Sequence, residues 1–347
     1  MKKKNIVNLI RYFAEKNEPA FRAEAFEIAK DFDSNNDSEL AEYITALLST
    51  ANVFVPQMQN NESYFLKKIQ PSNELLPLPN AIEKDLIGII NAIQKDRDVS
   101  KFLFYGAPGT GKTESVKHIA RILERDLFSV NFDSLIDSKL GQTSKNISSL
   151  FDELNNITHP NKVIILFDEI DALALDRTNS NDLREMGRAT SALLRGFDQI
   201  DSRIVIIATT NLFEKFDKAL IRRFDTFVNF NRYTQADLFD IGNALFNHYV
   251  LKFKINGKNT RLFKKILLLC PKLPYPGELK NTIKTALAFS DPEDNSDFLR
   301  RLYESLIGQI PTNVGEFQKQ GFTVRETEIF SGISKSQVAR SLQAGNK

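Results

Sequence analysis

The stretch that decides the fold is FLFYGAPGTGKTESVKHIA, Phe102–Ala120. An apolar run typical of a buried strand leads into three glycines, a lysine and a threonine, and a helical pattern then begins. Glycine loses more chain entropy on folding than other residues, so this clustering indicates that the backbone conformation itself is needed. The alternative is a glycine-rich strand–helix turn that binds no ligand.

The spacing within this stretch favours a phosphate-binding loop. Gly106, Gly111, Lys112 and Thr113 fit the pattern G-x-x-x-x-G-K-[ST]. In such a loop, backbone N–H groups surround phosphate oxygens, the lysine reaches the β- and γ-phosphates, and the hydroxyl holds Mg²⁺. The positive end of the following helix dipole points at the same anion. The sequence therefore predicts a site for a nucleoside triphosphate and Mg²⁺.

A second stretch, VIILFDEIDAL at Val163–Leu173, ends an apolar run on two adjacent carboxylates. Ligands collect at the carboxyl ends of strands in open α/β sheets. Asp168 is suited to hold Mg²⁺, often through water. Glu169 is suited to polarise an attacking water molecule. A solvated acidic turn is the alternative for this pair.

Composition limits the class of protein. The chain has 347 residues, enough for two or three domains, and an ordinary hydrophobic content of 42%. Its net charge of +2 implies no nucleic-acid or membrane partner for the chain as a whole, and a single cysteine, Cys270, suits a reducing compartment. No apolar stretch approaches the ~18 residues of a membrane span. The basic start makes a poor signal peptide, so we expect a soluble cytoplasmic protein.

Periodicity predicts the architecture. Five apolar runs, FLFYG, LFSVNF, KVIILFDE, RIVIIATTN and TFVNF, alternate with helical patterns between Lys101 and Asn231. This alternation predicts a parallel five-stranded sheet with helices on both faces. Outside this region, helical spacing extends up to about Gln57, over 232–290 and into the tail, and the prolines at 71, 77 and 79 mark a linker.

Four motifs carry a resemblance to a known family. GAPGTGKT resembles its Walker A motif, IILFDEIDAL its Walker B motif, IIATTN its sensor 1, and DKALIRRFD the segment that carries its arginine fingers. Over roughly residues 80–290 the chain resembles AAA-type ATPases, the AAA branch proper of the AAA+ superfamily. The resemblance implies the AAA+ P-loop fold, a small helical lid domain, and a homo-oligomeric ring, usually a hexamer, with nucleotide at each interface.

The domain boundaries expected on this basis are 1–70 for a helical N-terminal adaptor or docking domain, 71–100 for a linker and entry helix, 101–231 for the large α/β ATPase subdomain, 232–290 for the lid, and 291–347 for a helical C-terminal segment.

The resemblance also implies roles for single residues. Asn211 would hydrogen-bond the γ-phosphate and the water, and Arg222 and Arg223 would project into the neighbouring subunit's site to stabilise the transferring phosphoryl group. An exposed ion pair is the alternative for the two arginines. The expected nucleotide contacts of the loop are Gly106, Pro108, Gly109, Thr110, Gly111, Lys112, Thr113 and Glu114.

Two stretches depart from the family pattern. In DSKLGQTSKN, Lys139, Leu140 and Gly141 stand where the family often has a pore loop with an aromatic residue. A structural turn there is as consistent as a loop that grips a threaded polypeptide. In PGELKNTIKTA, Lys280 stands where many AAA+ proteins have the sensor 2 arginine. Lys280 can contact phosphate as a point charge, or it is a solvated lysine.

The two ends of the chain suggest partners. RYFAEKNEPAFRAEAFEIAKDFDSNNDSELAEYITALL resembles the start of bacterial AAA proteins encoded beside subtilisin-like proteases, which implies an adaptor for a partner protein. FTVRETEIFSGISKSQVARSL resembles a helix-turn-helix, although Glu328 stands where such motifs usually have a small residue. Its second helix would lie in the major groove of DNA; a helical hairpin that docks on protein is the alternative. The residues expected toward DNA are Lys335, Ser336, Gln337 and Arg340.

Three hypotheses for function follow. The leading one is a ring-forming, Mg²⁺-dependent ATPase that remodels a partner macromolecule. The second is a regulatory switch, in which ATP binding controls assembly with a partner such as a subtilisin-like protease. The third is a DNA-associated ATPase that binds DNA through its C-terminal segment.

Overall fold

The computed structural model describes residues 3–15, 17–34, 48, 63–70, 77–136, 141–171, 180–255 and 259–345. The chain divides into two compact units, Met1–Glu62 and Ser63–Lys347. Residues 35–47 and 49–62 of the expected helical N-terminal domain lie outside the described residues.

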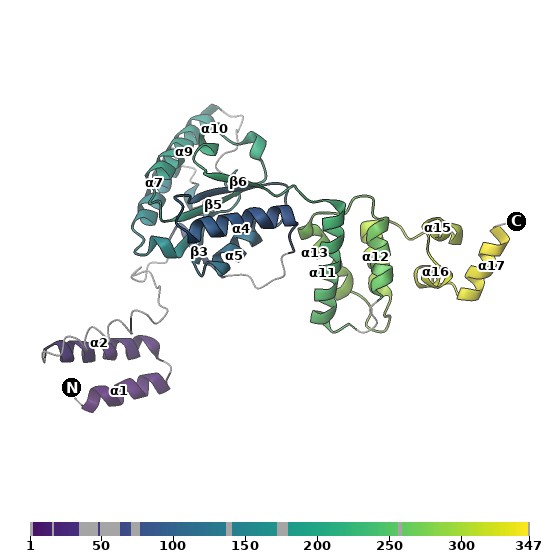
Figure 1. Ribbon diagram of the computed structural model, residues 1–347, viewed down its shortest axis with the longest axis horizontal. Helices are drawn as coiled ribbons and strands as arrows, with labels where there is room; N and C mark the ends of the chain where they lie inside the picture. Colours follow the sequence, from purple (N-terminus) through teal and green to yellow (C-terminus); the bar gives the residue numbers. More distant parts are fainter. Residues whose placement is uncertain are drawn as a thin grey trace. The chain divides into compact units, whose positions relative to one another are not determined.

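The first unit contains the helices α1 (Lys3–Ala14) and α2 (Glu18–Ser34), which pack against each other (Figure 1). Phe13 and Phe21 face each other with ring centroids 6.1 Å apart. The break between the helices is set by Asn17, whose side-chain oxygen accepts a hydrogen bond from the Ala20 N–H at 3.3 Å. A side-chain oxygen that accepts a backbone N–H three residues on is the local signal of a helix start.

The second unit is built on a six-stranded sheet of order β1-β3-β4-β5-β2-β6. The strands from β3 to β6 in this order pair in parallel, and β1 pairs with β3 antiparallel. Every residue of β4 and β5 is buried, as a strand covered on both faces requires. The strands are β1 (Leu66–Ile69), β2 (Lys101–Tyr105), β3 (Asp126–Val130), β4 (Val163–Phe167), β5 (Val205–Thr210) and β6 (Thr226–Asn229).

The expectation of five strands is wrong by one. The five parallel strands are those predicted, but β1 adds a sixth at the edge of the sheet. Its sequence, LKKI, has two exposed lysines between a buried leucine and a half-buried isoleucine, so it carries little apolar signal. Short, lysine-bearing strands are typical of sheet edges, where they discourage pairing with another chain.

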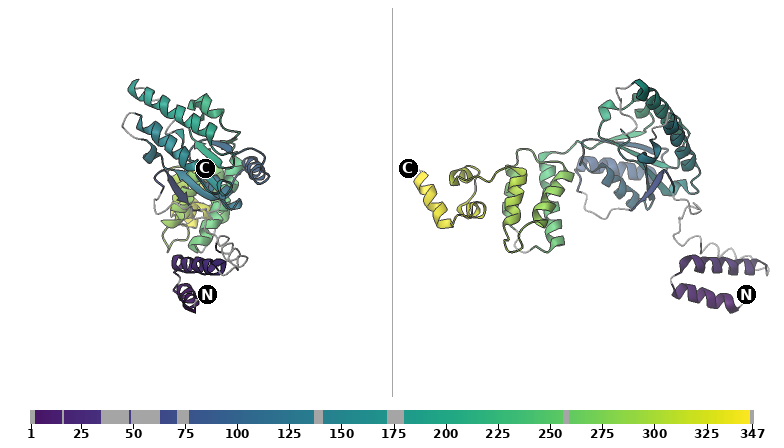
Figure 2. Two further views of the ribbon diagram at one scale, coloured as in Figure 1. Left: turned by 90° about the vertical axis from the view of Figure 1, so that its left-hand side faces the viewer. Right: turned by 180° about the vertical axis from the view of Figure 1, so that it is seen from behind.

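Helices cover both faces of the sheet (Figures 1 and 2). On one face α4 and α5 bury side chains such as Ile82 and Val116 against Ile164 and Ile207. On the other face, α7 and α9 bring Phe151 and Phe197 against Phe167, with ring centroids 5.5–6.2 Å apart. The helices and 3₁₀ turns of this part are α4 (Asn80–Gln94), α5 (Lys112–Ile122), α6 (Phe132–Leu135), α7 (Gln142–Asn155), η1 (Pro160–Lys162), α9 (Ser180–Gln199), η2 (Phe213–Lys215) and α10 (Lys218–Ile221).

The rest of the second unit is helical. Its helices are α11 (Gln235–Phe253), α12 (Thr260–Leu269), α13 (Pro276–Ala288), α14 (Asp297–Leu306), α15 (Val314–Lys319), α16 (Val324–Ser331) and α17 (Lys335–Gly345). Helices α11 to α16 share one hydrophobic core, in which Phe246 stacks on Phe263 at 4.0 Å between ring centroids and Tyr303 packs against Phe330 at 5.2 Å. This core runs from α11 through α16, so α14–α16 are packed on the preceding helices.

Among the described residues, no helix has both the length and the apolar character that a membrane span requires.

Candidate functional site

The phosphate loop lies between β2 and α5 in a conformation that only glycine adopts easily. Gly106, Gly109 and Gly111 have φ angles of +149°, +74° and +93°. A Cβ atom on Gly106 would lie 3.1 Å from the Cβ atom of Phe230, which directly follows β6, so a side chain there would also be crowded. The neighbouring Ala107 N–H donates to Asn231 Oδ1 at 2.7 Å, which fixes the start of the loop.

The helix α5 begins directly at Lys112, after Gly111 at its N-cap. The first N–H groups of a helix have no acceptor within the helix, and its dipole is positive at this end. A loop of glycines therefore presents backbone donors to an anion at the start of α5.

Lys112 is held at the centre of the site. Its Nζ atom donates to the carbonyl oxygens of Gly106 and Ala107, at 2.7 and 2.9 Å, and to Asn211 Oδ1 at 2.7 Å. Burial lowers the pKa of Lys112, and the carboxylates of Asp168, Asp171 and Glu169 oppose this shift. The amino group is thus a buried cation whose present partners are neutral oxygens, which an anionic ligand can replace.

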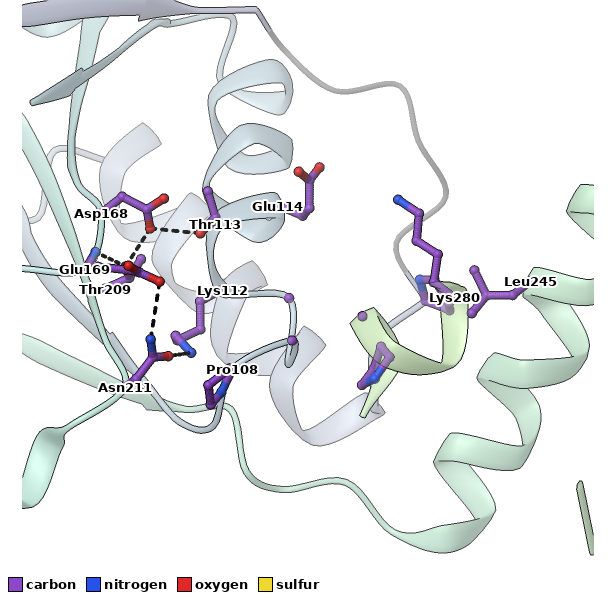
Figure 3. Close-up of a pocket in the computed structure, with 15 residues that line it drawn as sticks. Pro108, Lys112, Thr113, Glu114, Asp168, Glu169, Thr209, Asn211, Leu245 and Lys280 are labelled. Atoms are coloured by element: carbon purple, nitrogen blue, oxygen red, sulfur yellow. Dashed lines mark hydrogen bonds between the residues drawn. The ribbon is translucent and has the colours of Figure 1, made fainter. Parts of the chain in front are cut away.

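Asp168 lies directly after β4 and faces Thr113 of α5 (Figure 3). Its Oδ1 atom accepts hydrogen bonds from Thr113 Oγ1 at 2.8 Å and from Thr209 Oγ1 at 2.6 Å. A hydroxyl and a carboxylate oxygen thus lie side by side at the carboxyl end of the sheet. Both are ligand types that Mg²⁺ accepts, with waters completing its shell.

Glu169 follows with an unusual backbone. Its φ angle is +55°, in the left-handed region that is costly for a residue with a side chain. The Glu169 N–H donates to Thr209 Oγ1 at 2.8 Å, and Asn211 Nδ2 donates to Glu169 Oε1 at 3.4 Å. These contacts from β5 hold an exposed carboxylate beside the Lys112 amino group.

The helical part closes the other side of the loop. Gly277, in the first turn of α13, donates its N–H to the Gly109 carbonyl at 2.7 Å, and a Cβ atom on Gly277 would come within 2.9 Å of Gly109 Cα. Tyr233, just before α11, donates its hydroxyl to the Thr110 carbonyl at 2.7 Å. Burial raises the pKa of Tyr233 above its usual value, and Asp237 adds to this shift, so the hydroxyl stays protonated as a donor.

These elements enclose a pocket of about 270 Å³, drawn in Figure 3. Most of the expected site residues line it, including Lys280, which reaches it from α13. Gly106 and Thr110 are not part of the lining. Gly106 accepts from Lys112, and the fully buried Thr110 donates its hydroxyl to the Ala107 carbonyl at 2.8 Å, so both shape the loop from within. The expected residues in the lining are Pro108, Gly109, Gly111, Lys112, Thr113, Glu114, Asp168, Glu169, Asn211 and Lys280.

Several residues of the site were not expected from the sequence. Thr209 contacts both Asp168 and the Glu169 backbone, and its position two residues before Asn211 on the adjacent strand is a usable signal. Gly277 could be suspected from the dipeptide Pro276–Gly277 at a helix start. Tyr233 and the apolar lining residues Pro77 and Leu245 carry no such signal, because only the folded chain brings them to the loop.

Arg222 and Arg223 lie elsewhere. They follow α10 and do not line the pocket. Arg222 is exposed, while Arg223 makes a two-bond ion pair with Asp198 of α9, at 3.0 Å for both contacts, and also donates to the Ala219 carbonyl at 3.2 Å. The hydrogen bonds from Arg223 lower the pKa of Asp198.

A strand, a glycine loop and a helix beside an acidic strand end define a P-loop nucleotide-binding protein. Comparison with known sequences is more specific. The sequence model described as "ATPase family associated with various cellular activities (AAA)" matches residues 102–232. The uncharacterized AAA family ATPase y4kL of Sinorhizobium fredii is 31% identical over 232 residues, which cover 61% of this chain and 69% of the relative. The chain belongs to the AAA family of ATPases.

Other similarities are more limited in extent. Proteasome-activating nucleotidase 2 of Halobacterium salinarum is 35% identical over 158 residues, covering 44% of this chain and 36% of that protein. The chain thus spans about a third of the length of this relative. Among solved structures, a chain of the E. coli MS115-1 HORMA:CdnC:Trip13 complex aligns with a TM-score of 0.55 at 17% identity, covering 69% of this chain and 95% of that one. This likeness supports the fold alone.

Proposed function

We propose that the pocket binds ATP with Mg²⁺ and hydrolyses it, and that the chain does so within a ring that remodels a partner macromolecule. The observation that carries the proposal is the convergence of a buried lysine, a hydroxyl–carboxylate pair and an amide–carboxylate pair on one pocket. Lys112, Thr113 with Asp168, and Asn211 with Glu169 make up these three groups.

Each group has a chemical role in this proposal. Lys112 exchanges its carbonyl partners for phosphate oxygens, while the N–H groups at the start of α5 bind the same anion. Thr113 and Asp168 would hold Mg²⁺, which neutralises charge on the phosphates. Glu169 accepts a proton from the attacking water, and Asn211 orients that water and the γ-phosphate.

The ring is proposed from the arginine pair. Phosphoryl transfer benefits from a cation at the transferring group, and an arginine supplied in trans is worth about 10³–10⁵ in rate. Arg222 and Arg223 do not line their own pocket, and Arg222 is exposed. A neighbouring copy that presents this surface to the pocket would complete the site.

The competing form of this proposal is an ATP-gated switch. It differs in what turnover achieves: hydrolysis resets an assembly with a partner, such as a protease, without pulling on a threaded chain. The pore-loop expectation bears on this choice, but Lys139 and Leu140 lie outside the described residues, and Gly141 is the N-cap of α7. Stimulation of the ATPase rate by an unfolded polypeptide favours threading, and stimulation by a folded protease favours the switch.

Partner docking is proposed for the first unit. On α1, Val7, Ile10 and Phe13 are exposed by 64%, 64% and 74%. An apolar stripe of this kind on a helix fits a partner protein with an apolar groove. Co-elution of a purified subtilisin-like protease with the intact chain, lost in Ile10→Asp, is the result expected. Co-elution that is unchanged in Ile10→Asp would show that docking does not use this stripe.

The test of the nucleotide site is Lys112→Ala. Removing one partner of a buried charge interaction costs about 2–5 kcal/mol, so we expect ATP affinity by calorimetry to fall by about thirtyfold to several thousandfold. The matched control is Lys145→Ala, because Lys145 lies in the first turn of α7, which also follows a left-handed glycine, Gly141. Undiminished ATP binding by Lys112→Ala would show that this loop does not hold the phosphates.

A further inference from the structure

The last three helices of the second unit form a compact group, α15, α16 and α17, that the nucleotide site does not use (Figure 1). α17 contacts both α15 and α16. α16 ends at Ser331 and is capped by Gly332, whose φ of +67° is left-handed, and α17 begins three residues after this glycine. Two helices joined by a short turn with glycine, supported by a third helix, is the arrangement of helix-turn-helix proteins.

The two sides of α17 differ in chemistry. Val338 is fully buried and fixes the inner side. The residues at the start of the helix that face solvent are all polar: Lys335, Ser336, Gln337, Arg340 and Ser341. A helix that docks on protein typically offers an apolar stripe, whereas a helix that reads DNA offers donors and acceptors.

We infer that α17 binds duplex DNA in the major groove, with Lys335, Gln337 and Arg340 toward the nucleic acid. Arginine and lysine pair with guanine or phosphate, and glutamine pairs with adenine, so this set of side chains is able to read base edges. Gln337 Oε1 now accepts from Ser334 Oγ at 3.0 Å, a contact within the chain that a base edge can replace.

The charge of the surface fits this partner. From Val314 to Ser341, the exposed charged side chains are four cations and two anions: Lys319, Arg325, Lys335 and Arg340, with Glu316 and Glu328. Arg325 lies in the first turn of α16, the helix that crosses the DNA backbone in this arrangement. Its expected partner is therefore a DNA phosphate. Such a contact would orient the group α15–α17 on the duplex but would not depend on the base sequence.

Glu328 does not obstruct the helix pair. The side chain is exposed, and its Oε1 atom accepts the Lys335 N–H at 3.1 Å. The Glu328 side chain is thus accommodated at the start of α17, where it accepts the first N–H of that helix. Its charge offsets part of the positive helix end, so Glu328→Gln is expected to strengthen DNA binding.

The group α15–α17 is fixed to the preceding helices by polar contacts as well as by the shared core. Lys265 of α12 donates to Glu326 Oε2 at 2.6 Å and to the Gly321 carbonyl at 2.5 Å, and Arg300 of α14 donates to the Ile329 carbonyl at 2.9 Å. Deleting the last helices would expose this core, so single substitutions on the surface of α17 are the sharper test.

The experiment is a fluorescence-anisotropy titration of a mixed-sequence DNA duplex with the intact chain at several salt concentrations. We expect binding at low salt that weakens steeply as salt rises, because each phosphate contact contributes about 0.9 to the slope of log K against log salt. Lys335→Ala with Arg340→Ala should weaken binding by about tenfold or more and reduce that slope. Gln337→Ala should alter the sequences selected from a randomised duplex library and leave the slope unchanged.

The control is Lys284→Ala, which removes an exposed lysine from α13, outside the group α15–α17. It should change neither the DNA affinity nor its salt dependence. Lys112→Ala should bind DNA as the unaltered chain does, so a failure of the nucleotide site is distinguished from a failure of this inference. Thermal unfolding serves as the measure of folding for every variant, because Lys112→Ala is itself expected to lose ATP affinity. No binding at low salt, or equal affinity and slope in the Lys335→Ala, Arg340→Ala chain, would overturn the inference.

Discussion

The nucleotide pocket and the arginine pair use charged side chains in opposite ways. In the pocket, Lys112 is buried and contacts three oxygens of its own chain, all close to where an anion would lie. Arg223 lies on the surface and is paired with Asp198, more than half of whose side chain is exposed. The first charge is held by the sheet and its loops, and the second by a solvent-exposed ion pair.

This difference separates two properties. A pocket whose groups all come from one chain is able to bind nucleotide in that chain alone. A cation on the surface outside the pocket acts on phosphate only if another copy brings it there. We therefore expect a single chain to bind ATP, whereas rapid hydrolysis requires two neighbouring chains.

The largest effect is expected for Arg222→Ala combined with Arg223→Ala. Turnover should fall by about 10³–10⁵ while ATP affinity is kept, because the arginines stabilise charge that develops only during phosphoryl transfer. Steady-state phosphate release and calorimetry measure the two quantities. Mixing this variant with Lys112→Ala should restore part of the activity, since some interfaces then combine an intact pocket with intact arginines.

Arg203→Ala is the control for that pair, because Arg203 is also an exposed arginine bound to an aspartate, Asp201. Its turnover should match that of the unaltered chain. A monomer that hydrolyses ATP at full rate without Arg222 and Arg223 would contradict the division between one chain and two.

The next largest effect on turnover is expected for Glu169→Gln. An amide cannot accept the proton of the attacking water, so turnover should fall by about 10²–10⁴, and ATP binding should persist. The control is Glu124→Gln, because Glu124 is another glutamate with a left-handed backbone, at φ +52°, outside the pocket lining. If Glu169→Gln hydrolyses ATP at close to the normal rate, another residue must accept the proton of the attacking water.

Tyr233→Phe tests how far the helical part supports the pocket. It removes the hydrogen bond to the Thr110 carbonyl, and such bonds contribute about 0.5–1.5 kcal/mol, so ATP affinity should fall by about two- to tenfold. Tyr275→Phe is the control, since its ring packs on Tyr233 at 5.9 Å between centroids and its hydroxyl is not part of that bond. Equal affinities in the two variants would show that the loop holds its shape unaided.

The smallest effect is expected for Asp198→Asn, which releases Arg223 from its ion pair. Exposed ion pairs contribute little to folding, so thermal unfolding should be unchanged within error. Turnover should be kept or raised, because Arg223 no longer has to leave a carboxylate to act elsewhere. A loss of turnover would indicate that Asp198 holds Arg223 in its working position.

Sequence predicted the parts of the site that lie close together along the chain. Each of these parts is a short continuous segment: the loop from Gly106 to Thr113, and the pair Asp168–Glu169. Strand patterning places each segment directly after a buried strand. Thr209 and Tyr233 were missed because their roles arise from contacts 41 and 123 residues away along the chain. The edge strand β1 was missed because its alternation is too short and too polar to be told from a loop.

The left-handed backbone of Glu169 lowers folding stability at a position where the proposed mechanism needs a carboxylate. A residue with a side chain in this region costs about 1–3 kcal/mol, which the surrounding contacts of Thr209 and Asn211 must offset. Glycine would adopt the same backbone without strain, but it has no carboxylate. In the proposed mechanism, position 169 is therefore one at which the most stable chain and the most active chain have different sequences.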